Sequence, residues 1–152
     1  MSFAILFSTP ASAASWKSSV PQWITKIADS VQDRDTELSN EATARRQQIS
    51  CLALGVYYES RGESIRGQQA VASVIMNRTR SGKFPDTPCG VILQKGQFSP
   101  FANGATKKPS GVLWTQAVGI AKNYIARSSG DIPHLYFSGA GRGMRIGNHI
   151  FH

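Results

Sequence analysis

Two carboxylates four residues apart, Glu59 and Glu63, are the groups of this 152-residue chain best suited to acid–base chemistry. They lie in the stretch YYESRGES, residues 57–64. A glutamate that is partly withdrawn from water keeps its proton to higher pH, as a general acid requires. Glu59 follows two tyrosines at the end of an apolar helix face, which favours that state, whereas the nearby Arg61 opposes it. The alternative is a solvated charge at a helix end.

Glu63 follows Gly62, so it is not expected on the same helical turn as Glu59. It could cap the next helix, or pair with Arg61 or Arg66. Other chemistries have little support. The chain contains no HExxH, GxxxxGK[ST] or GxSxG pattern. The three histidines lack the helical spacing of a metal pair, so no metal or cofactor is predicted.

Several elements must position these acids. The pattern predicts a short helix over 15–31, a polar link over 32–40, and a longer helix from Glu41 to Gly62 that places Glu59 in its last turn. Further helices are predicted over 67–82 and 111–128. Between them, Pro88 begins a short turn through residue 94, after Asp86 or Thr87 as cap. The tail 134–151 suggests a hairpin around a glycine-rich turn. The fold class is α+β, mainly helical.

Positive charge is concentrated in the C-terminal two thirds of the chain. Residues 1–50 carry five basic and five acidic side chains, whereas residues 51–152 carry twelve basic and four acidic ones. A basic surface attracts anionic polymers such as nucleic acid, acidic lipid or bacterial cell wall. Nucleic acid is disfavoured because no binding motif or series of stacking aromatics accompanies the charge. No apolar run is long enough for a membrane span, so no stable membrane insertion is expected.

The N-terminus and the cysteines indicate an extracytoplasmic protein. Residues 1–14 are uncharged and end in small residues, like a truncated secretory signal peptide cleaved after Ala13 or Ala14, although no basic region precedes them. The alternative is a disordered N-terminus. Cys51 and Cys89 could form one disulfide in an oxidising compartment, or remain two buried thiols. We therefore expect a helical extension over 15–50, a domain over 51–152, and a periplasmic or secreted location.

Three stretches in this order resemble the SleB-type cell-wall hydrolases, which include spore-cortex lytic transglycosylases. They are CLALGVYYESRGESIRGQQAVASVIMNR, FPDTPCGVILQKGQFSP and RIGNHIF. The resemblance implies a lysozyme-like α+β fold and peptidoglycan glycan strands as substrate. It implies cleavage of the β-1,4 bond between N-acetylmuramic acid and N-acetylglucosamine. The first glutamate of the ExRGE motif, here Glu59, would be the catalytic acid.

The remaining site residues are expected to contact the sugar. Amides and hydroxyls bind sugar hydroxyl and acetamido groups, and aromatic rings stack on sugar faces. The alternative for each is a structural role. These candidates are Tyr58, Glu63, Gln97, Phe98, Ser99, Tyr136, Asn148 and His149.

Three functions remain open. Lytic transglycosylation needs one protein carboxylate, which suits a basic domain that is poor in acids. A muramidase would need a second carboxylate, such as Glu63 or Asp131, to hold a water. An inactive peptidoglycan-binding protein would keep the groove without turnover. The oligomeric state is open, with a monomer as the default.

Overall fold

The computed structural model describes residues 21–98 and 109–152, without the side chains of residues 24, 25 and 28. The predicted signal peptide and Ser99 lie outside these ranges. The chain separates into two compact units between Ala42 and Thr43. The candidate site residues from Tyr58 to His149 lie in the second unit, residues 43–152.

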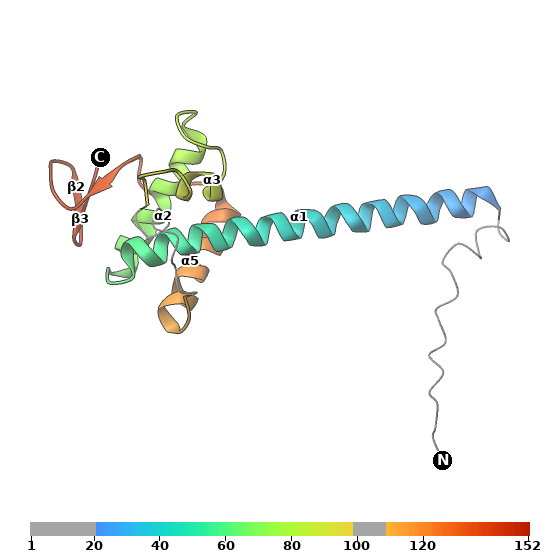
Figure 1. The fold of residues 1–152 in the computed structure, drawn as a ribbon, viewed down its shortest axis with the longest axis horizontal. Coiled ribbons are helices and arrows are strands. Elements are labelled where there is room, and N and C mark those ends of the chain that lie inside the picture. The colour runs from blue at the N-terminus through green and yellow to red at the C-terminus, as the bar shows by residue number, and fades with distance from the viewer. Residues whose placement is uncertain (1–20, 99–108) are drawn as a thin grey trace, which may run out of the picture. The chain divides into compact units, whose positions relative to one another are not determined.

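Helix α1 runs from Gln22 to Ser60 without a break, so the predicted polar link over 32–40 is wrong (Figure 1). That stretch contains no proline or glycine to stop a helix. Its Thr36 hydroxyl donates to the carbonyl of Gln32 at 2.9 Å, inside the helix, instead of capping a new one. The helix ends where it was expected to, with Glu59 in its last turn.

Helix α2, Ile65–Arg80, is the central element of the second unit and packs against α3, α5 and β2. It begins two residues before the predicted start because Ser64 caps it, accepting a hydrogen bond from the backbone N–H of Gly67 at 3.2 Å. Gly55 of α1 lets the two helices approach closely. A Cβ there would lie 2.8 Å from Cδ1 of Ile75. Leu52, Ala53 and Val56 of α1 are fully buried in the shared core.

Helices α3 and α5 begin at or within one residue of their predicted starts. Helix α3 spans Pro88–Ile92 and begins at Pro88 as predicted, although it ends before residue 94. Of the two candidate caps, Asp86 and Thr87, the structure has Thr87. Helix α5 spans Val112–Arg127, within one residue of the predicted range at each end. Figure 1 shows α2, α3 and α5 grouped around the C-terminal part of α1.

The three strands form one small antiparallel sheet. They are β1 (Phe137–Ser138), β2 (Met144–Ile146) and β3 (His149–Phe151), in the spatial order β1-β3-β2. The predicted hairpin around the glycine-rich turn is therefore wrong, because residues 139–143 connect two strands that both pair with β3. The tight turn is instead Gly147-Asn148, where Gly147 has φ +60°. The α+β, mainly helical class is confirmed.

Candidate active site

Glu59 is half-buried at the end of α1, with Arg78 of α2 as its charged neighbour. Burial raises the pKa of Glu59 above its ordinary value, and the positive charge of Arg78 partly opposes this rise. The end of the helix is held in place by Ser60, which is buried and donates to the carbonyl of Val56 at 2.7 Å. A carboxyl in this environment keeps its proton to a higher pH than an exposed glutamate, as a general acid requires.

Arg78 links Glu59 to the segment that follows α3. Its side chain is only 4% exposed. Nε donates to the carbonyl of Leu135 at 2.7 Å, and Nη1 donates to Oε1 of Gln97 at 3.1 Å. Burial lowers the pKa of Arg78 from a very high ordinary value, so the side chain remains a cation at neutral pH. It supplies the fixed positive charge of the site.

Aromatic rings surround this guanidinium. Its central carbon lies 4.8 Å from the ring centre of Phe84, 5.7 Å from that of Phe98 and 5.5 Å from that of Tyr136. Such contacts stabilise a desolvated cation. The sequence carries a signal for Arg78, because it is a charged residue on the apolar face of a helix. A cation buried there needs several partners.

The expected sugar contacts around Arg78 are only partly available. Gln97 is exposed and bonded to Arg78, so its amide remains open to a ligand. Phe98 is 1% exposed and packs in the core, so its expected contact with a sugar is replaced by its contact with Arg78. Tyr136 is 44% exposed and its ring stacks on His152 at 5.8 Å between ring centres. It is the better placed aromatic for a sugar face.

Glu63 and Asn148 form a clamp between the α1–α2 turn and the β2–β3 turn. The Nδ2 of Asn148 donates to Oε1 of Glu63 at 2.7 Å, and its backbone N–H donates to Oε2 at 3.2 Å. These bonds hold the pKa of Glu63 below its ordinary value. Glu63 was expected to contact substrate, but its carboxylate is engaged in tying the α1–α2 turn to the β2–β3 turn.

His149 and Tyr58 lie at aromatic contacts. The His149 ring meets Phe137 edge-on at 5.1 Å between centres, and its Nδ1 is buried without a hydrogen-bond partner among residues 21–98 and 109–152. Tyr58 is half-buried and meets Tyr57 edge-on at 5.2 Å. Each of the two side chains therefore packs against a neighbouring aromatic ring.

The other carboxylates of residues 43–152 are hydrogen-bonded to neighbouring side chains or more exposed to solvent than that of Glu59. Asp131 accepts hydrogen bonds from the Tyr124 hydroxyl and from Arg127, whose Nη1 lies 2.8 Å from Oδ1, and these bonds lower the pKa of Asp131. Asp86 is exposed. Within the part of the chain that the structure describes, no group of three His, Cys, Asp or Glu side chains could hold a metal ion.

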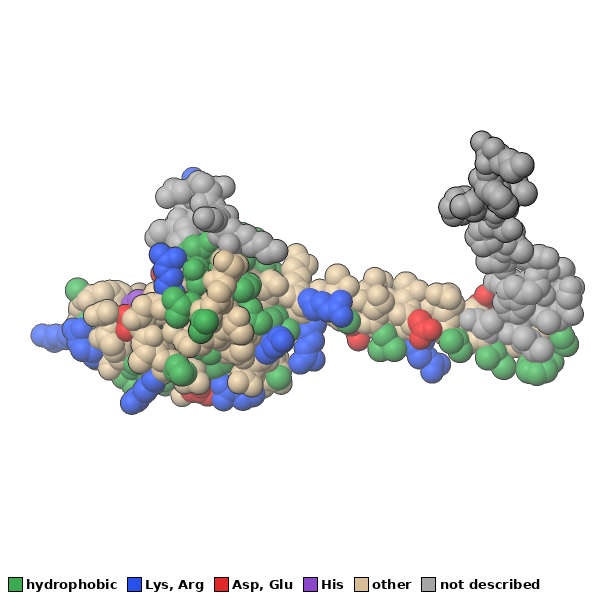
Figure 2. Space-filling view, turned by 90° about the horizontal axis from the view of Figure 1, so that it is seen from below, with side chains coloured by type: hydrophobic (Ala, Val, Ile, Leu, Met, Phe, Trp, Pro, Cys, Tyr) green, Lys and Arg blue, Asp and Glu red, His purple; other side chains and the backbone are tan. Residues whose placement is uncertain are grey.

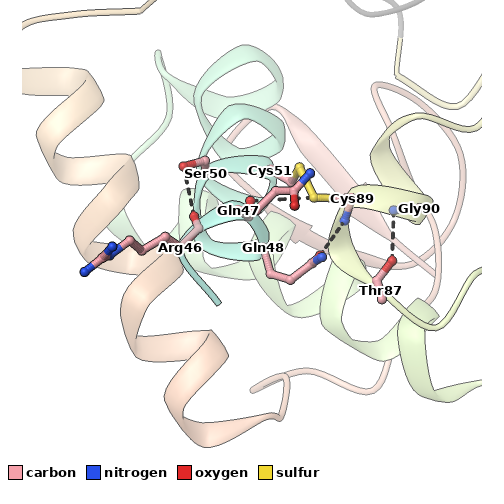
Figure 3. The surroundings of a disulfide bond; sticks show 8 residues. All are labelled: Arg46, Gln47, Gln48, Ser50, Cys51, Thr87, Cys89 and Gly90. Carbon is pink, nitrogen blue, oxygen red and sulfur yellow. Dashed lines mark hydrogen bonds between the residues drawn. A yellow bond between two sulfur atoms is a disulfide. The ribbon is translucent and has the colours of Figure 1, made fainter. Parts of the chain in front are cut away.

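A disulfide joins α1, which carries Glu59, to α3, which precedes Gln97. Cys51 of α1 is bonded to Cys89 of α3, so the open choice between a disulfide and two thiols is resolved in favour of the disulfide (Figure 3). Oε1 of Gln48 accepts the backbone N–H of Cys89 at 3.1 Å beside the bond. The link ties the start of the Gln97 segment to the helix that carries the acid.

The sequence model of the Cell Wall Hydrolase family matches residues 62–152. The chain belongs to this family. The match begins just after Glu59, so the candidate acid stands immediately before the matched range. Its charged neighbour Arg78, and Gln97, which is bonded to Arg78, lie inside that range.

Relatives of this cell wall hydrolase include spore cortex-lytic enzymes. The one from Oceanobacillus iheyensis is 50% identical over 56 residues, which cover 37% of this chain and 20% of the relative. The one from Bacillus subtilis is 34% identical over 113 residues, covering 68% of this chain and 36% of the relative. The chain thus spans between a fifth and about a third of the length of these relatives.

Solved structures agree with the family. The catalytic domain of the Bacillus cereus SleB protein aligns with a TM-score of 0.58 at 32% identity, covering 70% of this chain and 89% of that domain. The catalytic domain of the germination-specific lytic transglycosylase SleB from Bacillus anthracis aligns with a TM-score of 0.55 at 35% identity, covering 68% of this chain and 92% of that domain. The cell wall hydrolase fold therefore occupies the second unit.

Proposed function

We propose that this chain cleaves peptidoglycan glycan strands at the β-1,4 bond between N-acetylmuramic acid and N-acetylglucosamine by lytic transglycosylation. The observation that carries the proposal is the state of Glu59. It is a half-buried carboxyl whose pKa is raised by burial, at the end of the helix that precedes the family match. The names of its relatives, which are cortex-lytic enzymes and a lytic transglycosylase, support the same reaction.

Glu59 would act first as acid and then as base. Its proton passes to the glycosidic oxygen as the bond from that oxygen to C1 of the muramic acid breaks. The resulting carboxylate then takes the proton of the muramic acid 6-hydroxyl, whose oxygen bonds to C1. The acid is restored and the product carries an anhydro end. The nearby Arg78 would stabilise the carboxylate between the two steps.

The engagement of the other acids favours this route over a muramidase. Ordinary glycoside hydrolysis uses a second carboxylate roughly 5–10 Å from the first to activate water or bond to the sugar. Glu63 is held by Asn148, and Asp131 is held by Tyr124 and Arg127. Neither is a free base beside Glu59.

The surface of the unit and its disulfide suit work in the cell envelope. Figure 2 shows Lys and Arg side chains spread over this face of residues 43–152, with few acidic ones. A disulfide persists in oxidising compartments. We place the enzyme outside the cytoplasm, in the periplasm or secreted. No helix of residues 21–98 and 109–152 is both long and apolar enough to cross a membrane.

The test is loss of turbidity of purified peptidoglycan, followed by mass spectrometry of the products. Glu59→Gln should reduce the rate at least ~100-fold, the scale of general acid catalysis. Asp86→Asn is the matched control, because it removes one exposed negative charge from the same unit. Products lighter by one water than reducing ends identify transglycosylation, and reducing ends identify a muramidase. Equal rates for the wild type and Glu59→Gln would refute the proposal. Binding of sacculi without any released fragment would identify an inactive binding protein.

A further inference from the structure

Two adjacent hollows lie between α2, α5 and the residues around Asp131, apart from Glu59. One has a volume of about 280 Å³ and the other of about 260 Å³. They share Gln69, Tyr124 and Asp131 as lining residues, and together they are called here the α2–α5 hollow. Glu59 lines neither part. The reaction proposed above makes no use of this hollow.

The buried Ser73 and Tyr124 and the exposed Asp131 form a hydrogen-bonded polar network in the hollow. The hydroxyl of Ser73 donates to that of Tyr124 at 3.3 Å, and it accepts the backbone N–H of Asp131 at 2.8 Å. The Tyr124 hydroxyl donates to the Asp131 carboxylate, which Arg127 also holds. These groups satisfy one another, so they shape the hollow and leave recognition to the residues at its rim.

The rim offers hydrogen-bonding groups that the fold does not use. Arg66 and Gln69 line the larger part, and Gln69 and Asn123 line the smaller part. None of these three side chains makes a hydrogen bond or ion pair within the described parts of the chain. Arg66 and Asn123 are exposed, so a ligand would not have to displace an existing partner. Of the two cations that line the hollow, Arg127 is paired with Asp131, which leaves Arg66 and the two amides for a ligand.

Small apolar side chains complete the lining of the larger part. They are Ala70, Ile132 and Ile146, of which Ala70 and Ile146 are 3% and 8% exposed. The aromatic residue of the hollow, Tyr124, is 1% exposed and shows no ring face. A sugar normally stacks on an aromatic face, so the lining disfavours a sugar subsite. The lining suits a ligand that carries methyl groups, a carboxylate and peptide amides.

We propose that the α2–α5 hollow binds the acidic peptide stem that peptidoglycan carries on its muramic acid. Alanine methyl groups of the stem would rest against Ala70 and Ile146, and a stem carboxylate would pair with Arg66. Gln69 and Asn123 would bond the peptide groups. This inference rests on the proposed function, because it takes the substrate to be peptidoglycan, and it adds recognition of the peptide to recognition of the glycan.

The clamp between Glu63 and Asn148 connects this hollow with the acid. Arg66 follows Glu63 on the first turn of α2, and Ile146 precedes the Gly147-Asn148 turn. Along the chain, the α1–α2 turn therefore separates Glu59 from Arg66, and the β2–β3 turn directly follows Ile146. A stem seated in the hollow would orient the strand that the site cleaves.

A binding measurement tests the hollow without any cleavage. The probe is the synthetic tripeptide L-alanyl-γ-D-glutamyl-meso-diaminopimelate, added to ¹⁵N-labelled full-length protein. The side-chain amide signals of Gln69 and Asn123 should shift, and Arg66→Ala should weaken binding about tenfold, the loss expected for one charge-assisted hydrogen bond. The same tripeptide with its carboxylates amidated should also bind about tenfold more weakly. Unmoved signals, or equal binding of the two tripeptides, would overturn the proposal.

A cleavage measurement separates this inference from the proposed function. The substrates are intact peptidoglycan and glycan strands stripped of their stems by an amidase. Arg66→Ala should slow cleavage of intact peptidoglycan by about tenfold and leave stripped strands unaffected. Lys122→Ala, an equal loss of charge at an exposed α5 position outside the hollow, should change neither rate. An equal slowing of both substrates by Arg66→Ala would contradict stem recognition. Failure of the wild type on both would refute the proposed function, while the binding measurement still decides on the hollow.

Discussion

Asn148 donates to both carboxylate oxygens of Glu63, a residue 85 positions away in the chain. The pair fastens the turn after the candidate acid to the turn of the sheet. Through it, the C-terminal strands are held beside the α1–α2 junction, although no covalent link joins them.

Removing the contact between Glu63 and Asn148 should lower the free energy of unfolding by an amount that depends on pH. The pKa of Glu63 is lowered by Asn148, so the pair stabilises the fold above the ordinary glutamate pKa and loses that contribution as pH falls through the lowered value. Asn148→Ala should cost roughly 0.5–1 kcal/mol at pH 7, because the pair is solvent-accessible. Thermal unfolding should show a Tm difference at pH 7 that shrinks below pH 4. A constant difference would contradict the assignment, and Asn123→Ala is the neutral control.

Gly147 should tolerate no side chain. Its φ of +60° disfavours other residues, and a Cβ would collide with Oε2 of Glu63. Gly147→Ala should destabilise the protein by about 1–3 kcal/mol, measured by urea unfolding. Gly139→Ala, where a Cβ would meet nothing within 4 Å, should stay within about 0.5 kcal/mol of the wild type. Similar values for the two variants would show that the turn is not constrained as described.

Glu59→Gln should be inactive and yet more stable than the wild type at neutral pH. Burial raises the pKa of Glu59, so the fold favours its protonated form. The contribution of Glu59 to stability is therefore fully present below pH 4.5 and lost as pH rises through the raised pKa. Glutamine does not titrate. The Tm of the variant minus that of the wild type should be near zero at pH 4 and positive at pH 7.5, whereas Asp86→Asn should show no such trend.

Arg78 should influence the pH at which the cleavage rate falls on the alkaline side. Its charge opposes the rise in the pKa of Glu59. Arg78→Gln should therefore move the alkaline limb of the rate–pH curve to higher pH, and Arg78→Lys, which keeps the charge, should leave it in place. Both variants lose the bond from Nε to the Leu135 carbonyl and should lose about 1–3 kcal/mol of stability. An unmoved limb in a folded Arg78→Gln would exclude the electrostatic role.

Loss of the disulfide should lower the stability of the fold and leave cleavage at 25 °C largely intact. Cys51 and Cys89 are 38 positions apart, and closing such a loop stabilises a fold by roughly 3–4 kcal/mol in the chain-entropy account. The double variant Cys51→Ser/Cys89→Ser should unfold at a clearly lower temperature and retain cleavage at 25 °C. Reduction of the wild type by dithiothreitol should reproduce the shift in Tm. An unchanged Tm in both experiments would mean that the bond contributes nothing measurable.

Local signals in the sequence determined much of this protein. Pro88 after Thr87 determined the start of α3, and the apolar period together with Gly62 placed Glu59 in the last turn of α1. These features depend on residues a few positions away, whose interactions are the same in any fold. The same reasoning misjudged residues 32–40, because cap-type residues without a proline or glycine do not stop a helix.

Only the tertiary structure decided which distant side chains meet. Arg78 could be placed on a buried face, but its bonds to Gln97 and Leu135 depend on how α2 packs against the segments after α3 and before β1. The order β1-β3-β2 and the pairing of Glu63 with Asn148 likewise depend on which turn lies beside which. Residue types and spacing do not show which distant residues come into contact, because these contacts depend on how the whole core packs.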